Sequence, residues 1–388
     1  MIKTYKYKLY NNEAYLKKYD KWIGICRYVY NVAKEVRDES YKKGVSINYY
    51  DLAKQLTECK KEVSFIKDVN SQSLQSVLER LENSWKKYFK ELKDGTIYKG
   101  KAKYIEKKTK NGGKINYTKL KDFGKPKWAK KGDFQTIAFK NTSNSLRETE
   151  KGFLLPKFGE VKVFNKKYKI NGKIKQAKLT LEADGLYLNV IVECENKIRE
   201  NQSDNTIAID MGIKYFLTTS DGEFIDNPRH LFKFLKQLRV EQRSLNRKFK
   251  KGQKIQSKNF EKQKKVVAKL HQKIARIRRD FLHKLSSKLA NTYSIVVIED
   301  LKVSEMVRNT QYSKHISDVA WSMFFALLES KTNVARINPA YSSQECSKCG
   351  HTHKGNRPTQ SLFECVRCSH TENADLNGAN TLLNRYLN

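Results

Sequence analysis

Four cysteines near the end of the chain have the spacing of metal ligands. They form two C-x2-C pairs separated by 15 residues, namely Cys346, Cys349, Cys365 and Cys368. Four soft thiolates complete the tetrahedral shell of Zn²⁺ and leave no open position for a reacting molecule. The pattern therefore predicts a structural zinc ribbon. Two chance thiol pairs or two disulfides are the alternative interpretation.

Three acidic residues lie at the ends of predicted elements. Asp210 ends a short apolar strand, Glu299 ends a second one, and Asp375 precedes a segment with a helical pattern. Strands that are apolar on both faces lie inside a sheet, so an acid at the end of such a strand lies at a site edge rather than in the core. Each acid alone could instead be a helix cap or a surface salt-bridge partner.

Three carboxylates held together repel one another unless cations lie between them. Oxygen ligands of this kind suit Mg²⁺ or Mn²⁺. Two such ions could activate a water molecule and stabilise the leaving oxygen of a phosphodiester. If the acids at 210, 299 and 375 converge, the sequence predicts a metal-dependent site for phosphodiester hydrolysis.

The charge balance favours a polyanionic partner. The chain of 388 residues has 78 Lys and Arg against 41 Asp and Glu, which gives a net charge of +37. Nucleic acid is the leading candidate, because phosphate contacts by Lys and Arg release counterions. An anionic membrane surface is the weaker alternative. The same charge balance argues against a secreted disulfide scaffold, and Cys26, Cys59 and Cys194 are interpreted as ordinary reduced thiols.

The apolar pattern divides the chain into two halves. Residues 3–9 alternate as a strand, residues 13–85 have a helical pattern, and residues 134–194 return to strands. Polar residues 195–204 mark a boundary between the halves. The Lys- and Gly-rich stretch at 93–131 is interpreted as a basic loop, either a solvated linker or a nucleic-acid contact. No apolar run approaches the ~18 residues of a membrane span, and no signal-peptide core is evident, so we expect a cytoplasmic protein.

The second half contains a strongly basic helical region. Residues 229–290 include 21 Lys and Arg but three acids. A solvated helix face would mix its signs, so this excess predicts a groove for nucleic acid. The candidate contacts are Arg276, Arg278 and Arg279. In the first half, Gln72 and Gln75 share a helix face, and Tyr49 lies in a preceding polar segment. A Gln side chain can bond adenine in the major groove.

Several segments resemble the TnpB family, transposon-encoded RNA-guided nucleases related to miniature type V CRISPR effectors. Segments 209–214, 297–301 and 374–379 are similar to the three RuvC-type nuclease motifs of the family. The resemblance covers nearly all of 204–388, including 279–285, 316–321 and 342–350, where the family zinc ribbon begins. The N-terminal half matches more loosely. Trp128 stands where the family usually has Phe, and Ser369 where it usually has Gly.

The resemblance implies an RNA-guided DNA endonuclease of a transposable element, which would bind a noncoding guide RNA and cut DNA beside a target-adjacent motif. Asp210, Glu299 and Asp375 would be the metal-binding triad. Tyr49, Gln72 and Gln75 would contact the target-adjacent motif, with Gln75 the best match. We expect the protein in the prokaryotic nucleoid. The rivals are a miniature type V CRISPR effector, a nuclease-dead RNA-guided DNA-binding repressor and a DNA-strand transferase.

The implied fold is α/β plus β. An RNase H-like (RuvC) nuclease domain with an inserted zinc ribbon would follow a β-barrel wedge domain that carries a helical recognition module. The expected boundaries are 1–30 and 125–203 for the wedge, 31–124 for the helical module, 204–343 and 371–388 for the nuclease, and 344–370 for the zinc ribbon.

Overall fold

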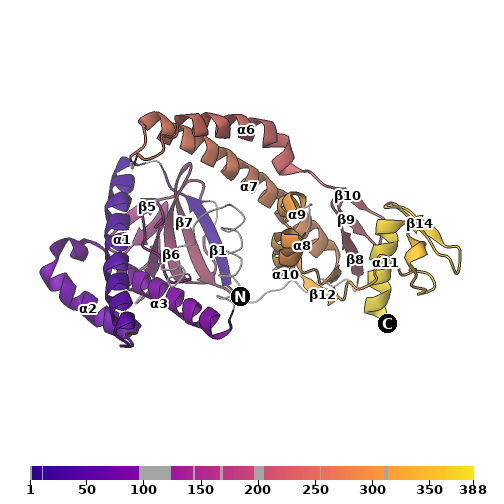
Figure 1. Cartoon of the computed structure of the whole chain (residues 1–388), viewed down its shortest axis with the longest axis horizontal. Helices are drawn as coiled ribbons and strands as arrows, with labels where there is room; N and C mark the ends of the chain where they lie inside the picture. Colours follow the sequence, from indigo (N-terminus) through magenta and orange to yellow (C-terminus); the bar gives the residue numbers. More distant parts are fainter. Residues whose placement is uncertain are drawn as a thin grey trace, which may run out of the picture. The chain divides into compact units, whose positions relative to one another are not determined.

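A computed structural model describes residues 2–10, 12–95, 124–142, 145–166, 169–195, 205–253, 255–309 and 313–388. The chain divides into two compact units, Met1–Glu195 and Asn196–Asn388 (Figure 1). Most of the predicted basic loop at 93–131 and of the polar boundary at 195–204 lies outside the described residues. In the described part of the chain, no helix is long and apolar enough to cross a membrane.

Three helices of the first unit begin at asparagine caps. They are α1 (Glu13–Lys42), α2 (Tyr49–Glu62) and α3 (Ser71–Lys93), with a short 3₁₀ turn at Ser64–Asp68 before α3. At each start an Asn side chain accepts a hydrogen bond from a backbone N–H of the first turn, which satisfies donors that a helix leaves unpaired. The capping residues are Asn12, Asn48 and Asn70.

The apolar stripe of α3 faces the core of the first unit. Leu74, Leu78 and Leu81 point inward, and at most 1% of each is exposed. Trp85 continues the stripe and is fully buried. The helical interpretation of residues 13–85 is therefore confirmed, and it places Gln72 and Gln75 in the first two turns of α3.

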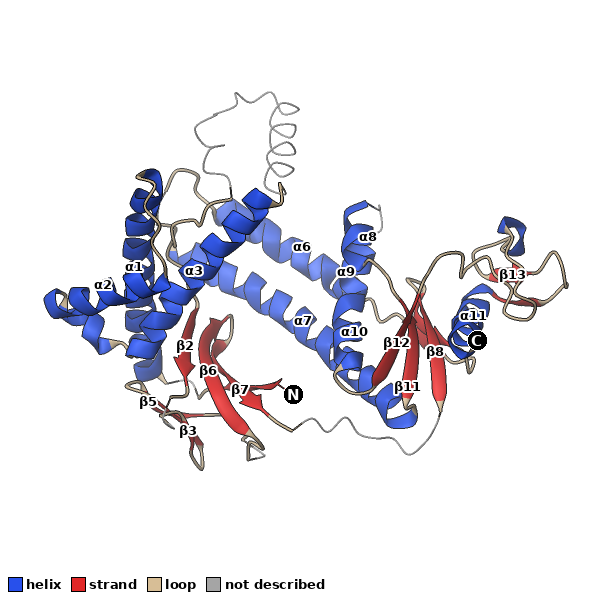
Figure 2. Ribbon diagram, turned by 90° about the horizontal axis from the view of Figure 1, so that it is seen from below, coloured by secondary structure: helices blue, strands red, loops and turns tan. Residues whose placement is uncertain are grey.

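The strands of the first unit form two sheets (Figure 2). The larger sheet is antiparallel with the order β1-β7-β6-β2, and the smaller has the order β3-β4-β5. A bridge between Leu9 and Val163 links them. The strand bounds are Ile2–Lys8 for β1, Thr136–Lys140 for β2, Arg147–Glu148 for β3, Gly152–Leu155 for β4, Gly159–Lys162 for β5, Lys173–Glu182 for β6 and Gly185–Glu193 for β7.

The second unit is built on a mixed sheet with the order β10-β9-β8-β11-β12. Strands β8, β11 and β12 are parallel, whereas β9 and β10 are antiparallel to their neighbours. The strand bounds are Thr206–Met211 for β8, Tyr215–Thr219 for β9, Phe224–Asp226 for β10, Ile295–Glu299 for β11 and Asn333–Ile337 for β12.

Helices cover both faces of this sheet, which explains why its central strands are apolar throughout. On one face, Ile207 and Ile209 pack in a core with residues of α7 (Lys258–Thr292) and α10 (Trp321–Glu329). On the other face, Ala208 packs with Leu382 of α11 (Ala374–Leu387). Two short helices, α8 (Val303–Asn309) and α9 (Ser313–Val319), precede α10.

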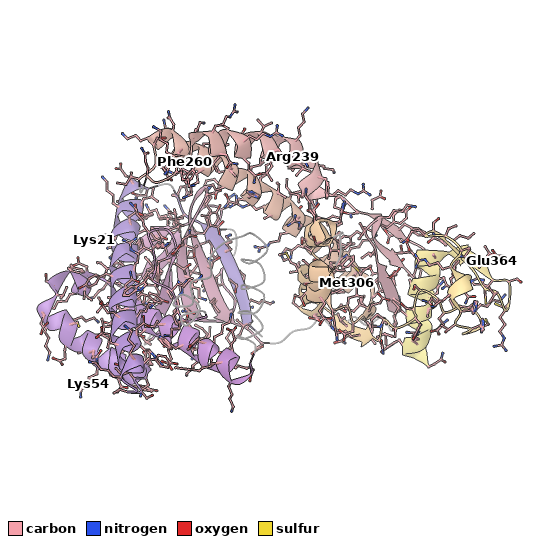
Figure 3. All side chains as sticks on the ribbon, in the orientation of Figure 1. Lys21, Lys54, Arg239, Phe260, Met306 and Glu364 are labelled. Carbon is pink, nitrogen blue, oxygen red and sulfur yellow. The ribbon has the colours of Figure 1, made fainter. Side chains whose placement is uncertain are left out.

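The basic region folds as a helical hairpin of α6 (His230–Lys248) and α7. A small core of Leu238, Val267, Leu270 and Ile274 holds the two helices together. Figure 3 shows the side chains along this hairpin, among them Arg239 and Phe260. Helix α7 thus has an apolar stripe at 267, 270 and 274 that packs against α6.

The four cysteines lie in an insertion between β12 and α11. Its described elements are a 3₁₀ turn at Lys354–Asn356 and a hairpin of β13 (Leu362–Glu364) and β14 (Thr371–Asn373). Its core is a cluster of Cys346, Phe363, Cys365 and Ala374. So few apolar residues give the insertion little hydrophobic stabilisation of its own.

Two glycines of the first unit provide a matched test of the fold. A Cβ on Gly152 of β4 would stand 1.9 Å from the carbonyl oxygen of Val161, whereas one on Gly24 of α1 meets nothing within 4 Å. We expect Gly152→Ala to destabilise the protein by about 2–3 kcal/mol. Gly24→Ala should stabilise it by about 0.5–1 kcal/mol. Urea unfolding measures both, and equal stability of the two variants would contradict this packing.

Candidate active site

The sheet of the second unit brings two of the three predicted acids together. Strands β8 and β11 are parallel neighbours, with Ile209 opposite Ile298. The residues that follow them, Asp210 and Glu299, therefore lie at the same edge of the sheet. Asp375 comes from the first turn of α11, where the Asn373 side chain accepts from its backbone N–H at 2.9 Å. A carboxylate in the first turn also interacts favourably with the helix dipole.

All three carboxylates line one pocket of about 690 Å³. Helix α11 lies close to Asp210, because a Cβ on Gly378 would stand 3.3 Å from Asp210 Oδ2. Two cationic side chains, Lys214 and Arg357, also line the pocket. The pocket therefore collects acids from two strands and one helix that are far apart in the sequence.

The neighbouring carboxylates of this pocket oppose the ionisation of Asp210. The pKa of Asp210 is raised to about 8, chiefly by burial and then by the charges of Glu299 and Asp375, against the lowering effect of Arg357. Burial also raises the pKa of Glu299, against the hydrogen bond from Ser342 and the charge of Arg385. A divalent cation among these oxygens would relieve the repulsion, and carboxylate oxygens are the ligands that Mg²⁺ and Mn²⁺ prefer, although in this structure the three carboxylates do not lie close enough to share one ion.

Two residues that sequence reasoning missed contact the acids. The hydroxyl of Ser342 donates to Glu299 Oε1 at 2.6 Å, and Arg357 Nη2 lies 3.3 Å from Asp375 Oδ1. Ser342 lies inside a recognised motif, at 342–350, that could have drawn attention to it. Arg357 had no such signal, because nothing in its local sequence distinguishes it from the many other basic residues of the chain.

The four predicted cysteines also come together. Their sulfur atoms all lie within 4.8 Å of one another, with Cys346 Sγ 3.7 Å from Cys368 Sγ and Cys349 Sγ 3.6 Å from Cys365 Sγ. Zinc–sulfur bonds of about 2.3 Å in a tetrahedron need sulfur atoms at about this separation. The geometry therefore fits one tetrahedral metal ion.

The cysteine thiols differ in their acidity without a metal. Burial raises the pKa of Cys346 to about 12. Burial also acts to raise the pKa of Cys365, but hydrogen bonds from the backbone N–H groups of Cys368 and Arg367 outweigh it and lower the value to about 7.

Among the described residues, the cysteines are the group whose ligand atoms are close enough to share an ion, and the three carboxylates do not form such a group.

The predicted DNA-reading residues lie in the first unit, on α2 and α3. Tyr49 begins α2, and it is half-buried, as are Gln72 and Gln75 on α3. Burial raises the pKa of Tyr49, and the charge of Glu79 on α3 adds to this rise. Tyr49 is therefore close to the helix that carries the two glutamines.

The three predicted arginines of α7 differ in their surroundings. Arg276 and Arg279 are exposed. Arg278 is half-buried and forms an ion pair at 2.5 Å with Asp318, which also accepts from the backbone N–H of Leu231. Arg278 therefore joins α7 to the start of α6 and to α9. That role inside the fold leaves less of its side chain available to a partner than at the other two positions.

Three family models match separate parts of the chain. Residues 1–45 match a model described as "Helix-turn-helix domain", 189–310 match "Probable transposase", and 321–382 match "Cas12f1-like, TNB domain". In this chain residues 1–45 form a strand and one long helix. The third match includes all four cysteines and Asp375.

Individual relatives match over different lengths. The chain is 29% identical over 387 residues to "Putative RNA-guided DNA endonuclease InsQ" of Escherichia coli strain K12, with 94% of this chain and 87% of the relative covered. It is 36% identical over 74 residues to "TnpB-like protein MJ1635" of Methanocaldococcus jannaschii, with 19% and 18% covered. The solved "Structure of the mini-RNA-guided endonuclease CRISPR-Cas_phi3" aligns at 10% identity and a TM-score of 0.47, over 99% of this chain and 92% of that one.

Two of the family models span the three acids and the four cysteines, and the E. coli relative aligns along 94% of the chain. In sequence the chain is thus similar to transposase-associated and TnpB-like proteins.

Proposed function

We propose that the protein is an RNA-guided DNA endonuclease of a transposable element, which uses a transposon-derived guide RNA to cut DNA beside a target-adjacent motif. The observation that carries this proposal is the convergence of Asp210, Glu299 and Asp375 on one pocket. The name of the E. coli relative supports it. The net charge of +37 supports a nucleic-acid partner.

Asp210, Glu299 and Asp375 would hold Mg²⁺ or Mn²⁺. Two such ions, when bound, supply an activated water and a counter-charge for the leaving oxygen of the phosphodiester. The protein's own part is to hold three oxygen ligands on separate elements around one pocket. Arg357 and Lys214 line the same pocket, and an Arg side chain can bind a phosphate through two parallel hydrogen bonds.

The four cysteines would hold Zn²⁺ in a closed structural site. The separations between their sulfur atoms support this assignment. The ion would stabilise an insertion whose core has few apolar residues. No position remains open on the ion, so its contribution is to the fold.

We assign the second unit to an RNase H-like (RuvC) nuclease domain, residues 204–343 and 371–388, with a zinc ribbon at 344–370. The sheet order β10-β9-β8-β11-β12, with helices on both faces, supports this assignment. Residues 1–30 and 125–203 would form a wedge barrel, supported by the bridge between the two sheets. Residues 31–124 would be the helical recognition module.

The guide RNA and the duplex target DNA would contact different residues. Tyr49, Gln72 and Gln75 would read the target-adjacent motif; Tyr49 begins α2, close enough to α3 to feel the charge of Glu79, and the two glutamines lie in the first two turns of α3. Arg276 and Arg279 on α7 would contact phosphates, with Arg278 contributing less because of its ion pair. Base pairing with the guide would supply most of the sequence specificity.

Isosteric removal of each acid tests the nuclease assignment. Asp210→Asn, Glu299→Gln and Asp375→Asn should each slow DNA cleavage at least about a hundredfold. Each change removes one metal ligand, and bound metal ions stabilise the charge of the transition state by several kcal/mol. Binding of guide RNA and target should persist. Cleavage of a matched target with co-purified RNA provides the measurement, and the exposed Asp280→Asn is the control. A variant that cuts at the wild-type rate removes its residue from the site.

The raised pKa of Asp210 also makes stability depend on pH. The pKa of Asp210 is about 8 in the folded protein against 3.8 for an ordinary aspartate. The folded state therefore binds one proton more between these values, so stability falls as pH rises, by on the order of 1 kcal/mol per pH unit. We expect the metal-free protein to melt lower at pH 8 than at pH 6.

Divalent cations should reverse this loss. Added Mg²⁺ or Mn²⁺ should raise the melting temperature more at pH 8 than at pH 6, because a cation replaces the proton. Asp210→Asn should show a smaller pH dependence and a smaller response to the cation. Differential scanning fluorimetry of both proteins measures this. The same pH dependence in the wild type and the variant would contradict the buried charge at Asp210.

Loss of zinc should affect the fold of the insertion before the chemistry. Chelation, or Cys365→Ser, should increase hydrogen exchange across 344–373 and at the start of α11, because a structural site contributes directly to folding. Cys194→Ser, outside the cluster, is the matched control. Metal analysis should find one zinc per chain, and its absence from purified protein would end this interpretation.

A further inference from the structure

The segment that joins β12 to the first cysteine pair, residues 338–347, passes beside the carboxylate pocket. Ser342 in this segment is buried, and its hydroxyl oxygen lies 2.6 Å from Glu299 Oε1 and 3.1 Å from the carbonyl oxygen of Pro339. A hydroxyl has one proton to donate, and a carboxylate is the stronger acceptor. The bond to Glu299 therefore dominates, and it restricts rotation of that carboxylate.

The turn that presents Ser342 is held in an unusual backbone conformation. Tyr341 is 66% exposed and has a φ of +60°, in the left-handed region that non-glycine residues rarely adopt. Its carbonyl oxygen accepts from the backbone N–H groups of Gln344 and Glu345 at 2.9 and 3.1 Å. Such a conformation costs about 1 kcal/mol or more. It orients the next residue toward the pocket.

The same segment is fixed to α11 through Asn377. This side chain is fully buried and bonds the backbone on both sides of Cys346. Asn377 Nδ2 donates to the carbonyl oxygen of Glu345 at 2.8 Å, and Asn377 Oδ1 accepts from the backbone N–H of Ser347 at 3.0 Å. Asp375 lies two residues earlier on this helix, so the contact fixes the position of Asp375 along the helix axis relative to the first cysteine pair.

Further polar side chains extend this seam along α11. Thr381 Oγ1 lies 3.3 Å from the carbonyl oxygen of Glu345, and Asn384 Nδ2 donates to that of Ser347 at 2.6 Å. Arg385 donates to the carbonyl oxygens of Asn338 at 2.8 Å and Ala340 at 3.0 Å, and it pairs with the Glu345 carboxylate. Residues 377, 381, 384 and 385 lie on one helix face. A fully satisfied polar network specifies a single geometry more strictly than apolar packing does.

We propose that residues 338–347 are a positioning segment for the carboxylate pocket, in which Ser342 orients Glu299 and the contact with Asn377 sets the position of Asp375. This inference rests on the proposed function, because it assigns the two residues a role toward the cation that the acids would bind. It makes the cysteine insertion a support for the pocket as well as a folded module. Residues that orient metal ligands typically change metal affinity or activity by 10–100-fold when they are replaced.

The test measures Mn²⁺ binding to the zinc-loaded full-length protein by electron paramagnetic resonance, with Asp210→Asn defining the specific signal. Ser342→Ala should bind Mn²⁺ about tenfold more weakly and cut DNA more slowly by a similar factor. Ser342→Thr keeps the hydroxyl and should restore both. Ser330→Ala is the matched control, because its hydroxyl bonds a backbone carbonyl at 2.7 Å and is exposed.

A second pair of variants tests the seam on α11. Asn377→Asp loses the donor to Glu345 but keeps an acceptor for Ser347, and it should weaken Mn²⁺ binding about tenfold. Asn380→Asp adds the same charge to the same helix, although Asn380 contacts Glu372 instead, and it should change binding less than threefold. Zinc content is measured in every variant. It should remain at the wild-type level in Ser342→Ala.

The outcomes separate the inference from the proposed function. Wild-type Mn²⁺ affinity in Ser342→Ala, or a failure of Ser342→Thr to restore it, would overturn the positioning role. Asp210-dependent Mn²⁺ binding in a protein that cuts no DNA would reject the nuclease while leaving the segment to be judged by the binding data. If Asn377→Asp loses zinc or unfolds, the Ser342 variants alone decide. A wild-type protein without Asp210-dependent Mn²⁺ binding would overturn the inference.

Discussion

Mutual repulsion among three carboxylates is the constraint on which the second unit depends. Asp210 is half-buried beside Glu299 and Asp375, and loss of solvation together with their charges raises its pKa to about 8. Holding these groups together costs free energy unless a proton or a cation offsets their charges. The favourable free energy must come from elsewhere, chiefly from the apolar strands β8 and β11, which are covered on both faces. A rigid apolar sheet can therefore hold acids in an arrangement that they would not adopt by themselves.

The three acids are positioned at the pocket by different parts of the fold. Two come from neighbouring parallel strands, which place their carboxyl ends at one edge without further help. The third lies beyond an insertion at 338–373, so its position depends on how that insertion folds. This segment has only a small apolar cluster of its own, so its core provides little stabilising free energy. A tetrahedral metal site would provide the remaining stabilisation. The polar seam between residues 345–347 and α11 then connects the order of the cysteine cluster to Asp375. The two predicted sites are thus parts of one structure.

Much of this could be predicted from sequence, because the signals are local. The strands before Asp210 and Glu299 are short apolar runs, and the cysteine spacing is specific. The antiparallel turn after Glu182 could also be predicted, and the paired residues Glu182 and Gly185 confirm it. Strand β12 and the short helices α8 to α10 had no periodic signal of sufficient length. The contacts of Ser342 with Glu299 and of Arg357 with Asp375 could not be predicted, since they join residues 43 and 18 positions apart. The ion pair of Arg278 with Asp318 could not be predicted either, because the sequence shows that residue 278 is basic but does not show which distant residue it contacts.

The second unit combines an acidic pocket with a strongly basic hairpin, and the two have complementary effects on a polyanion. A phosphodiester would be repelled by three carboxylates at short range, where bound cations and cationic side chains such as Lys214, Arg357 and Arg385 can offset their charge. At longer range the 21 Lys and Arg of residues 229–290 determine the sign of the potential. Salt screens this attraction over a Debye length of about 8 Å at physiological ionic strength. Each basic side chain therefore acts on the phosphates near it, and the many basic residues together act along an extended strand rather than at a single phosphate. Binding and chemistry can thus have opposite charge requirements in one unit, because they act over different distances.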